Sequence, residues 1–379
     1  MIPYNKIYKS QKEEKYILDS LDRRQISGDG YYTKLVEAFL TKRFNLNKVF
    51  MTTSATHALE MAMLLIDLKR GDEVIMPSFT FSSTANAVLL RGAKPVFAEI
   101  DIETLNLNPQ SLYNCVTEKT KAIIPVHYAG IGCEMGEIMD FANKYDLFVI
   151  EDAAQAVNAK FEGKYLGGIG HLGCYSFHGT KNFTSGEGGA LVVNTQDECL
   201  IERADCIRQK GTDRSKFLRG EVPSYSWVDI GSSYSPSDLT MAMLYGQLQD
   251  IDYITMQRKR VHELYSSLLQ KYVDKEIMNI TKIPANCESN YHIFYILFND
   301  SQTRDYVMEK LQQKGISAYT HFEPLHSALM GQGLGYNAGE LPVTMKVSQC
   351  ILRLPIYTEL TEIEMLFIAE SLEDILGGL

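Results

Sequence analysis

Short apolar segments alternate with amphipathic ones between about residues 50 and 195, and this alternation constrains the fold more than any other feature. The apolar segments are rich in Val and Ile and are predicted to be buried strands, at residues 74–77, 95–100, 122–128, 147–153 and 190–194. Apolar residues recur at helical spacing between them, near Leu59 and near Ile138. Such alternation predicts an α/β fold with a largely parallel sheet covered by helices on both faces. Ligands of these sheets bind beyond the carboxyl ends of the strands.

The rest of the chain, from about residue 235, shows a different pattern. Its predicted elements are, in order, a long helix at about residues 237–272, a strand at 291–298, a helix at about 304–314 that ends at Gly315, a strand at 316–322 and a final helix at about 362–376. We therefore expect two domains. Residues 1–236 would form the large domain, and residues 237–379 would supply a linking helix and a smaller α/β domain.

Charge and cysteine content exclude several classes of protein. The chain has 37 Lys and Arg against 47 Asp and Glu, a net charge of −10, and no dense basic run, so it is not expected to bind nucleic acid. Its seven cysteines are irregularly spaced without a Cys-x-x-Cys pair, so no metal site is expected. The sequence contains neither the apolar core of a signal peptide near Met1 nor a segment of transmembrane length. A soluble, cytoplasmic protein is the expectation.

Small and hydroxyl residues precede the first amphipathic helix, in the segment TTSATHALEMA at residues 52–62. The free N–H groups at the start of a helix bind phosphate well, and small side chains let an anion come close. An ordinary N-cap made by Ser54 or Thr56 is the alternative explanation. This segment by itself does not decide between the two.

An acidic pair, Glu151 and Asp152, lies at the carboxyl end of a very apolar predicted strand. A buried carboxylate is costly without a partner, so one of the two must face inward or end in a pocket. The other explanation, a helix N-cap by Asp152, is equally compatible with the sequence.

A single lysine lies in the polar segment between two predicted strands. Ser176, His178 and Lys181 fall within six residues, beside a turn rich in glycine, namely Gly179, Gly186, Gly188 and Gly189. A lysine held near a pocket loses its proton easily and can form a Schiff base, whereas most loop lysines are simply solvated. Phe79 and Phe81 follow another strand, where an aromatic ring either joins the core or stacks on a flat cofactor.

These four features together fit one cofactor. Pyridoxal phosphate requires a lysine for its aldehyde, an anion for its ring nitrogen, a phosphate cup and a face for stacking. The sequence supplies all four, each at a junction where a strand gives way to a helix or a loop. A pyridoxal-phosphate site is therefore predicted.

At these residues the chain resembles the pyridoxal-phosphate-dependent nucleotide-sugar aminotransferases of the DegT/DnrJ/EryC1 family, which have fold type I. The segments EDAAQA, SFHGTKN and GEGGA occur in the order of that family, and Asp152 lies 29 residues before Lys181, the usual interval. The resemblance covers essentially the whole chain, including the segments IPYNK, SGDGYYTK, DEVIMPSFTF, PVHYAG and RLPIY. The segments SGDG, HYAG and DIGSSY are most similar to members that make dTDP-4-amino-4,6-dideoxygalactose. That sugar enters surface polysaccharides such as enterobacterial common antigen and the O-antigen of lipopolysaccharide.

The resemblance implies a role for each matching residue. Lys181 would form the Schiff base and move the proton, Asp152 would pair with the ring nitrogen, Gln155 would contact the ring hydroxyl and Phe81 would stack on the ring. Three residues would meet the phosphate: Ala55, Thr56 and Ser176. Most relatives have glycine at the position of Ala55, so the approach to the phosphate is expected to differ slightly here.

The active sites of the family lie at a homodimer interface, which implies contributions from both subunits. Ser233 would contact the phosphate of the partner's cofactor, where many relatives carry a longer Asn. His321 would contact the sugar, and it is followed by Phe322 where many relatives have Tyr. The basic segment KGTDRSKFLRG at residues 210–220 suggests a separate hypothesis, that Arg214 binds the pyrophosphate of the sugar nucleotide; a solvated charged loop is the alternative explanation.

The implied reaction moves an amino group from glutamate to the 4-keto group of a nucleotide-linked 4-keto-6-deoxy sugar, giving dTDP-4-amino-4,6-dideoxygalactose. Another substrate is the first alternative, either a 3-keto isomer or a UDP-linked sugar. A sugar 3-dehydratase is a second, but relatives with that activity replace the lysine by His, and this chain keeps Lys181. A non-catalytic regulator on the same scaffold is a third.

Overall fold

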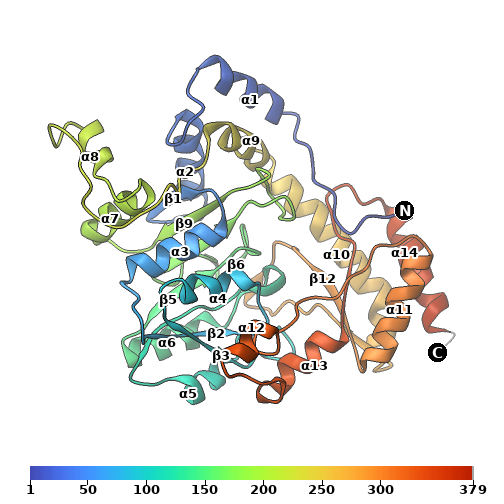
Figure 1. The fold of residues 1–379 in the computed structure, drawn as a ribbon. Helices are drawn as coiled ribbons and strands as arrows, with labels where there is room; N and C mark the ends of the chain where they lie inside the picture. Colours follow the sequence, from blue (N-terminus) through green and yellow to red (C-terminus); the bar gives the residue numbers. More distant parts are fainter. Residues whose placement is uncertain (378–379) are drawn as a thin grey trace.

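The computed structural model describes residues 1–377, and its centre is a seven-stranded sheet (Figure 1). One strand, β9, is antiparallel to both of its neighbours, and the other neighbouring pairs are parallel. The strands are, in spatial order, β1 (Lys48–Thr52), β9 (Gly189–Val193), β8 (Leu172–Ser176), β5 (Phe148–Asp152), β4 (Thr120–Ile123), β2 (Glu73–Pro77) and β3 (Lys94–Ala98). The mostly parallel sheet predicted from the alternation is therefore confirmed.

Helices cover both faces of this sheet, because successive strand residues point to opposite sides and both sides are apolar. Val149 of β5 belongs to one core and Ile150 to the other. Residues of α2, α6 and α9 build the first core, and residues of α3, α4 and α7 build the second. The helices of this part are α1 (Glu13–Asp22), α2 (Tyr31–Phe44), α3 (Ala55–Leu65), α4 (Ser82–Leu89), α5 (Leu112–Cys115), α6 (Met135–Tyr145), α7 (Glu198–Arg208), α8 (Arg214–Leu218) and α9 (Asp238–Leu248), with 3-10 turns at Pro109–Ser111 and Tyr128–Gly130.

A second, antiparallel sheet forms in the C-terminal part from β10 (Met278–Ile280), β12 (Phe294–Phe298) and β13 (Ile351–Leu354). Its core is shared with three helices, α10, α11 and α14. The helices of this part are α10 (Ile251–Val273), α11 (Ser301–Gln313), α12 (Leu329–Gly333), α13 (Pro342–Cys350) and α14 (Glu362–Leu376), with a 3-10 turn at Ala338–Glu340. A third small sheet contains β11 (Cys287–Glu288), β6 (Lys160–Phe161) and β7 (Lys164–Tyr165). The division of the chain at residue 236 stays a prediction.

Some predicted elements differ from the observed ones. The long helix at 237–272 is two helices, because Asp250 leaves helical geometry between α9 and α10 and its carboxylate accepts hydrogen bonds from Ser10 and Lys12, both at 2.6 Å. Residues 316–322 are not a strand; they make only isolated bridges. The final helix and the left-handed Gly315 (φ +78°) after α11 are confirmed.

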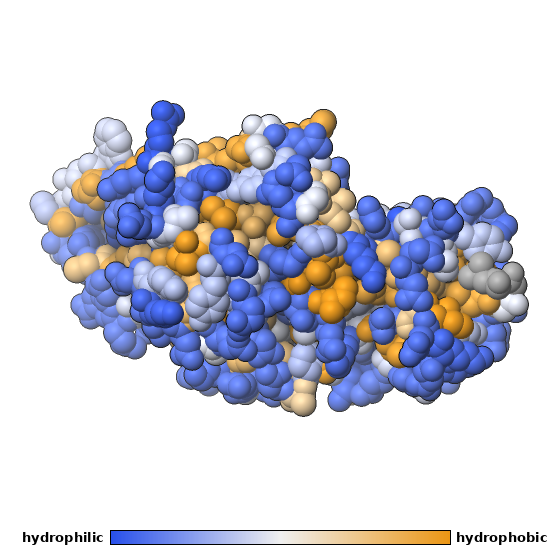
Figure 2. Space-filling view, turned by 90° about the horizontal axis from the view of Figure 1, so that it is seen from below, coloured by the Kyte–Doolittle hydropathy of each residue, from blue (hydrophilic) through white to orange (hydrophobic). Residues whose placement is uncertain are grey.

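Residues at the start of the chain lie against its C-terminal part (Figure 1). Ile2 donates its N–H to the carbonyl of Gly315 at 2.8 Å and accepts from the N–H of Ser317 at 3.0 Å. Hydrophilic residues cover most of the face in Figure 2, with hydrophobic groups between them. Among residues 1–377, no helix combines the length and the apolar character needed to span a membrane.

Candidate active site

A cavity of about 630 Å³ opens at the carboxyl ends of the central strands. Its lining comes from β5, β8, the start of α3 and the segment after β2, and also from the C-terminal part of the chain. The position agrees with the rule for parallel α/β sheets. Four of the predicted site residues, Asp152, Ser176, Lys181 and His321, line it.

The first turn of α3 forms one end of the cavity. Ser54 is the N-cap and accepts the N–H of His57 at 3.1 Å, while Ala55 and Thr56 line the cavity. The helix start lies directly against β9, where a Cβ on Gly189 would stand 2.3 Å from the carbonyl carbon of Ser54. Only glycine permits this close approach. Both explanations of this segment therefore coexist: Ser54 is an N-cap, and the free end of the helix dipole faces the cavity.

Asp152 faces the cavity from the end of β5, and its side chain is held from two sides. Its Oδ2 accepts the Thr84 hydroxyl at 2.8 Å, and its Oδ1 accepts the N–H of Ala154 at 3.2 Å. Thr84 also hydrogen-bonds Thr80 at 2.9 Å. Two fixed donors preorganise the carboxylate for a cationic or N–H group of a ligand.

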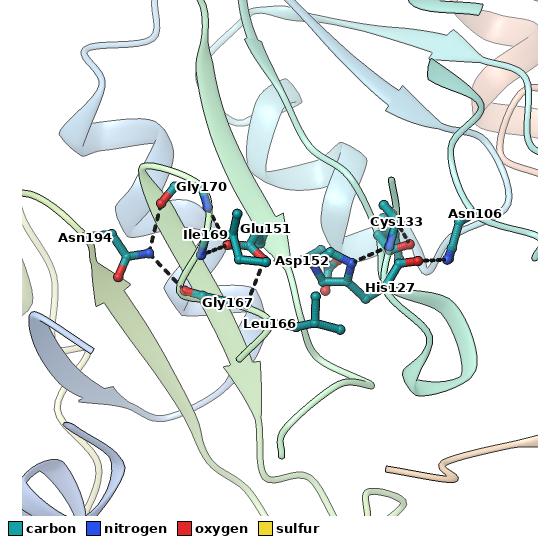
Figure 3. Close-up of polar contacts among 12 residues, drawn as sticks. Asn106, His127, Cys133, Glu151, Asp152, Leu166, Gly167, Ile169, Gly170 and Asn194 are labelled. Atoms are coloured by element: carbon teal, nitrogen blue, oxygen red, sulfur yellow. Dashed lines mark hydrogen bonds and ion pairs between the residues drawn. The ribbon is translucent and has the colours of Figure 1, made fainter. Parts of the chain in front are cut away.

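Glu151, the other member of the acidic pair, points to the opposite side and is completely buried (Figure 3). Its carboxylate accepts the N–H groups of Gly167, Ile169 and Gly170 at 2.6–2.7 Å and pairs with His127 Nε2 at 2.9 Å. His127 Nδ1 accepts the N–H of Cys133 at 3.1 Å, so the proton of the imidazole is on Nε2. Because β residues alternate in direction, one acid enters the cavity and its neighbour anchors the loop after β7.

Lys181 reaches the cavity from the loop after β8. The pKa of its amine is lowered to about 8, chiefly by burial; the charge of Asp152 opposes this shift and that of Arg353 adds to it. A substantial fraction of this amine is therefore neutral near physiological pH and able to act as a nucleophile or base. The alternative that Lys181 is a solvated loop lysine is wrong.

Two further predicted residues, Gln155 and Ser176, line the cavity and keep polar groups available for a ligand. Gln155 accepts the N–H of Ala129 on its Oε1 at 2.8 Å, which leaves its amide N–H groups for a ligand. Ala129 has a positive φ of 57°, so this hydrogen bond holds an unusual turn. Ser176 is buried at the end of β8, where its hydroxyl lines the cavity.

Phe81 and His321 both line the cavity. Phe81 is 63% exposed in the single chain, whereas Phe79 is buried in the core. His321 receives or donates a hydrogen bond of 2.9 Å with the Tyr128 hydroxyl. Burial, Arg353 and Lys181 together lower the pKa of His321 well below its usual value, so this imidazole is neutral.

Arg214 and Ser233 do not line the cavity of their own chain. Arg214 is exposed in α8 and donates to Gln209 Oε1 at 3.4 Å. Ser233 is exposed and forms an isolated bridge with Gln209. Their predicted roles therefore require a second subunit and stay predictions.

Several cavity residues were not predicted, and three of them are basic side chains from the C-terminal part: Arg258, His292 and Arg353. Arg258 is 4% exposed, and Arg353 lies over the ring of Tyr4 with its guanidinium carbon 4.8 Å from the centroid. Arg353 belongs to the RLPIY segment, so its presence there was the only available signal. Arg258 lies beside Lys259 and Arg260 in a helical pattern. His292 lies in the segment predicted as a strand, which in the structure begins only at Phe294, so neither residue gave a signal.

The residues present fit pyridoxal phosphate. The cavity holds a partly neutral amine on Lys181, a preorganised carboxylate on Asp152 and the start of α3 as an anion site. These are the three fixed groups that the cofactor requires of a protein.

Comparison with known proteins agrees with this chemistry. The model of the DegT/DnrJ/EryC1/StrS aminotransferase family matches residues 8–373. The chain is 33% identical to a pleiotropic regulatory protein of Geobacillus stearothermophilus, covering 99% of this chain and 97% of that one. It is 30% identical to a GDP-perosamine synthase of Caulobacter vibrioides, covering 96% and 95%. A protein of Streptococcus pneumoniae, 23% identical, has the same fold with a TM-score of 0.92 over the whole of both chains, and was solved in PMP and PLP forms.

These findings confirm the predicted family, the fold type and the cofactor. The narrower resemblance to transaminases that make dTDP-4-amino-4,6-dideoxygalactose stays a prediction. The chain belongs to the DegT/DnrJ/EryC1/StrS aminotransferase family and is a pyridoxal-phosphate-dependent sugar aminotransferase.

Proposed function

We propose that the protein transfers an amino group from glutamate to the 4-keto group of a nucleotide-linked 4-keto-6-deoxy sugar. The observation that carries the proposal is that Lys181 and Asp152 line one cavity, with the pKa of the lysine amine lowered to about 8. When bound, pyridoxal phosphate supplies an electron sink for the carbon that loses its proton. Our proposed product is dTDP-4-amino-4,6-dideoxygalactose.

The chain's own residues divide the work between the two ends of the cavity. At one end, the N–H groups of Ala55 and Thr56 and the hydroxyl of Ser176 bind phosphate. At the other, Asp152 holds a positive charge on the ring nitrogen, and Gln155 donates an N–H to the ring hydroxyl. Between the two ends, the Lys181 amine removes and returns the proton at the reacting carbon, for which a pKa near 8 is well suited.

A homodimer with shared active sites is part of the proposal. The segment that includes α8 projects away from the rest of the chain (Figure 1). It exposes apolar side chains, of which Trp227 is the most exposed at 81%, and isolated chains rarely leave such a surface uncovered. A second copy that packs against this segment would place its cavity beside Arg214 and Ser233 of the first copy. The same contact would cover the exposed Phe81.

Two observations bear on the identity of the nucleotide. The segments SGDG, HYAG and DIGSSY favour a dTDP-linked sugar, whereas the Caulobacter relative carries a name that specifies a GDP-linked one. The two sugars share a keto group across the ring from the pyrophosphate. The lining residues near His321 therefore serve either substrate.

One experiment tests the function directly. The purified enzyme with its cofactor is incubated with glutamate and each of a panel of keto-sugar nucleotides: the dTDP-, GDP- and UDP-linked 4-keto-6-deoxy sugars and a 3-keto isomer. NMR of the product identifies the amino sugar and its stereochemistry. Conversion of the dTDP-linked 4-keto sugar to the galacto product supports the proposal. Preference for any other member of the panel would show that the proposed substrate is wrong and would identify the substrate in its place.

A regulatory function is the alternative that a specific finding favours, because the Geobacillus relative carries the name of a regulatory protein. The complete set of cavity residues argues against a role without catalysis. A chain that binds the cofactor but converts no keto sugar, and whose cellular effect survives Lys181→Ala, would establish the regulatory role instead.

A further inference from the structure

The segment at residues 289–292 joins β11 to β12 without regular structure, and its backbone is held in an uncommon conformation. Tyr291 has a φ of 57°, in the left-handed region that a bulky residue rarely adopts. Its N–H donates to the Ser289 hydroxyl at 2.9 Å. A conformation of this kind persists only where the surroundings impose it, and such residues concentrate at functional sites.

A buried arginine holds this segment. Arg258 of α10 donates from Nε to the carbonyl of Tyr291 at 3.0 Å and from Nη2 to the carbonyl of His292 at 2.7 Å. Within residues 1–377 no carboxylate pairs with it, and burial lowers its pKa to about 10. Burying the charge of an arginine without an acidic partner costs folding free energy, so its hydrogen bonds must compensate for that cost. Here it fixes two consecutive carbonyl groups.

Asn290, in the middle of the segment, attaches it to the residues that follow Asp152. Its Nδ2 donates to the carbonyl groups of Gln155 and Val157, both at 2.9 Å. Gly130 leaves room for the other end of the same amide, since a Cβ there would stand 1.8 Å from Asn290 Oδ1. The segment and the acidic edge of the cavity therefore move as one unit.

Asn182, the residue directly after Lys181, is attached to the same segment twice. Its Nδ2 donates to the carbonyl of Asn290 at 2.7 Å, so its Oδ1 is the acceptor for His292 Nδ1 at 2.9 Å. This assigns the proton of His292 to Nδ1 and leaves a lone pair on Nε2. Burial and the neighbouring Lys181 lower the pKa of His292 well below its usual value, which agrees with a neutral ring.

We propose that Asn182, Asn290 and His292 are positioning residues for the amino transfer. Through them, the segment at 289–292 fixes the backbone of Lys181 to the backbone that follows Asp152, so that the amine and the acid keep a constant separation. The proposal rests on the function given above only in so far as Lys181 is the reacting lysine. It does not depend on which sugar is the substrate.

The first test compares two substitutions of His292 in the enzyme with bound cofactor. Asparagine at this position places an amide N–H near the place of Nδ1 and can still donate to Asn182, whereas glutamine places its amide near Nε2. We expect His292→Asn to keep kcat for glutamate within about 3-fold, and His292→Gln to lose about 10-fold, the scale of one buried hydrogen bond. The reverse order would overturn the proposal, because it would mean that Nε2 contacts the substrate directly.

A spectroscopic measurement accompanies the rates. The visible absorbance of the cofactor attached to Lys181 changes with pH, and the midpoint of that change reports the surroundings of the lysine. We expect the midpoint to shift by at least half a pH unit in Asn182→Ala and in His292→Gln but not in His292→Asn. A midpoint unchanged in all three variants would overturn the proposal.

A second pair controls for simple loss of stability. Asn182→Ala is compared with Asn286→Ala, whose side chain lies outside the cavity and contacts Glu134 at 3.4 Å. We expect only Asn182→Ala to weaken cofactor binding and to lower kcat about 10-fold, with KM for glutamate unchanged. Equal effects of the two variants would overturn the proposal. An absorbance band that persists in Lys181→Ala would instead refute the role of Lys181, so the two failures are distinguishable.

Discussion

The cavity has two walls of different origin. One is the edge of the seven-stranded sheet, where Asp152, Ser176 and the start of α3 each follow directly from a strand. The other is the C-terminal part, where Arg258 and His292 come from a long helix and an irregular segment. In our proposals, the first wall supplies the groups that react or bind the cofactor, and Arg258 and His292 of the second wall hold those groups in place. We therefore expect substitutions in the two walls to separate catalysis from its support.

The largest effect is expected at Lys181 itself. Lys181→Ala should lose at least about 1,000-fold in turnover, because the neutral amine is both nucleophile and base, and it should lose the visible absorbance of the lysine-bound cofactor. The measurement is a single-turnover assay with glutamate together with an absorbance spectrum. Asn286→Ala is the control, and we expect it to keep the turnover and the absorbance spectrum of the parent protein. Substantial turnover in Lys181→Ala would mean that the first wall does not supply the reacting amine, and the proposed difference in function between the two walls would be lost.

Asp152→Asn tests whether the charge of the carboxylate at the sheet edge is needed for catalysis. The amide keeps the shape of the side chain but not the charge, so we expect kcat to fall by about 100-fold, the scale of one preorganised electrostatic group. The cofactor-free variant should unfold at the same temperature as the parent, as followed by circular dichroism. A variant that keeps full activity would show that the carboxylate does not act on the ring nitrogen.

Glu151→Gln is the matched substitution on the opposite side of the same strand. It removes a buried charge that accepts three backbone N–H groups and pairs with His127, so we expect a loss of about 3 kcal/mol in the free energy of unfolding. Urea denaturation measures this value. Because Glu151 does not face the cavity, the folded fraction should retain normal kcat. A stable but inactive variant would contradict this separation.

The smallest effect is expected in the C-terminal part and depends on pH. His262 of α10 is buried, its Nε2 has no hydrogen-bond partner among residues 1–377, and burial lowers its pKa to about 4. The unfolded chain binds this proton below about pH 6.5, whereas the folded protein binds it only near pH 4. Its contribution to stability is therefore complete above pH 6.5 and is lost as pH falls to 4, by about 2 kcal/mol between pH 7 and pH 5.

His262→Gln should weaken that dependence, since glutamine does not titrate. Urea denaturation of both proteins at pH 7 and pH 5 measures the change, and the other ionisable groups cancel in the comparison. Equal pH dependence in the two proteins would mean that His262 gains a proton in the folded state near its ordinary pKa.

The difference between the walls also explains what the sequence could predict. Asp152 and Lys181 belong to contiguous segments at strand ends, and the alternation of apolar residues located those ends. The apolar pattern alone could not show which of Glu151 and Asp152 faces the cavity, because the direction of each side chain depends on where β5 ends. Only the family resemblance singled out Asp152. Arg258, His292 and Asn290 escaped prediction because their partners lie far along the chain; Asn182 and Asn290 are 108 residues apart. The helix predicted at 237–272 was misjudged for a similar reason, since Asp250 interrupts the helical pattern through contacts with Ser10 and Lys12.

The contact between Ile2 and the residues around Gly315 has a consequence for biosynthesis. A ribosome that has completed β9 has already delivered Ile2, Asp152 and Lys181, yet the C-terminal wall of the cavity and the residues around Gly315 that Ile2 contacts are still to be translated. Such a nascent chain should capture the coenzyme poorly, so loading would follow release of the finished polypeptide.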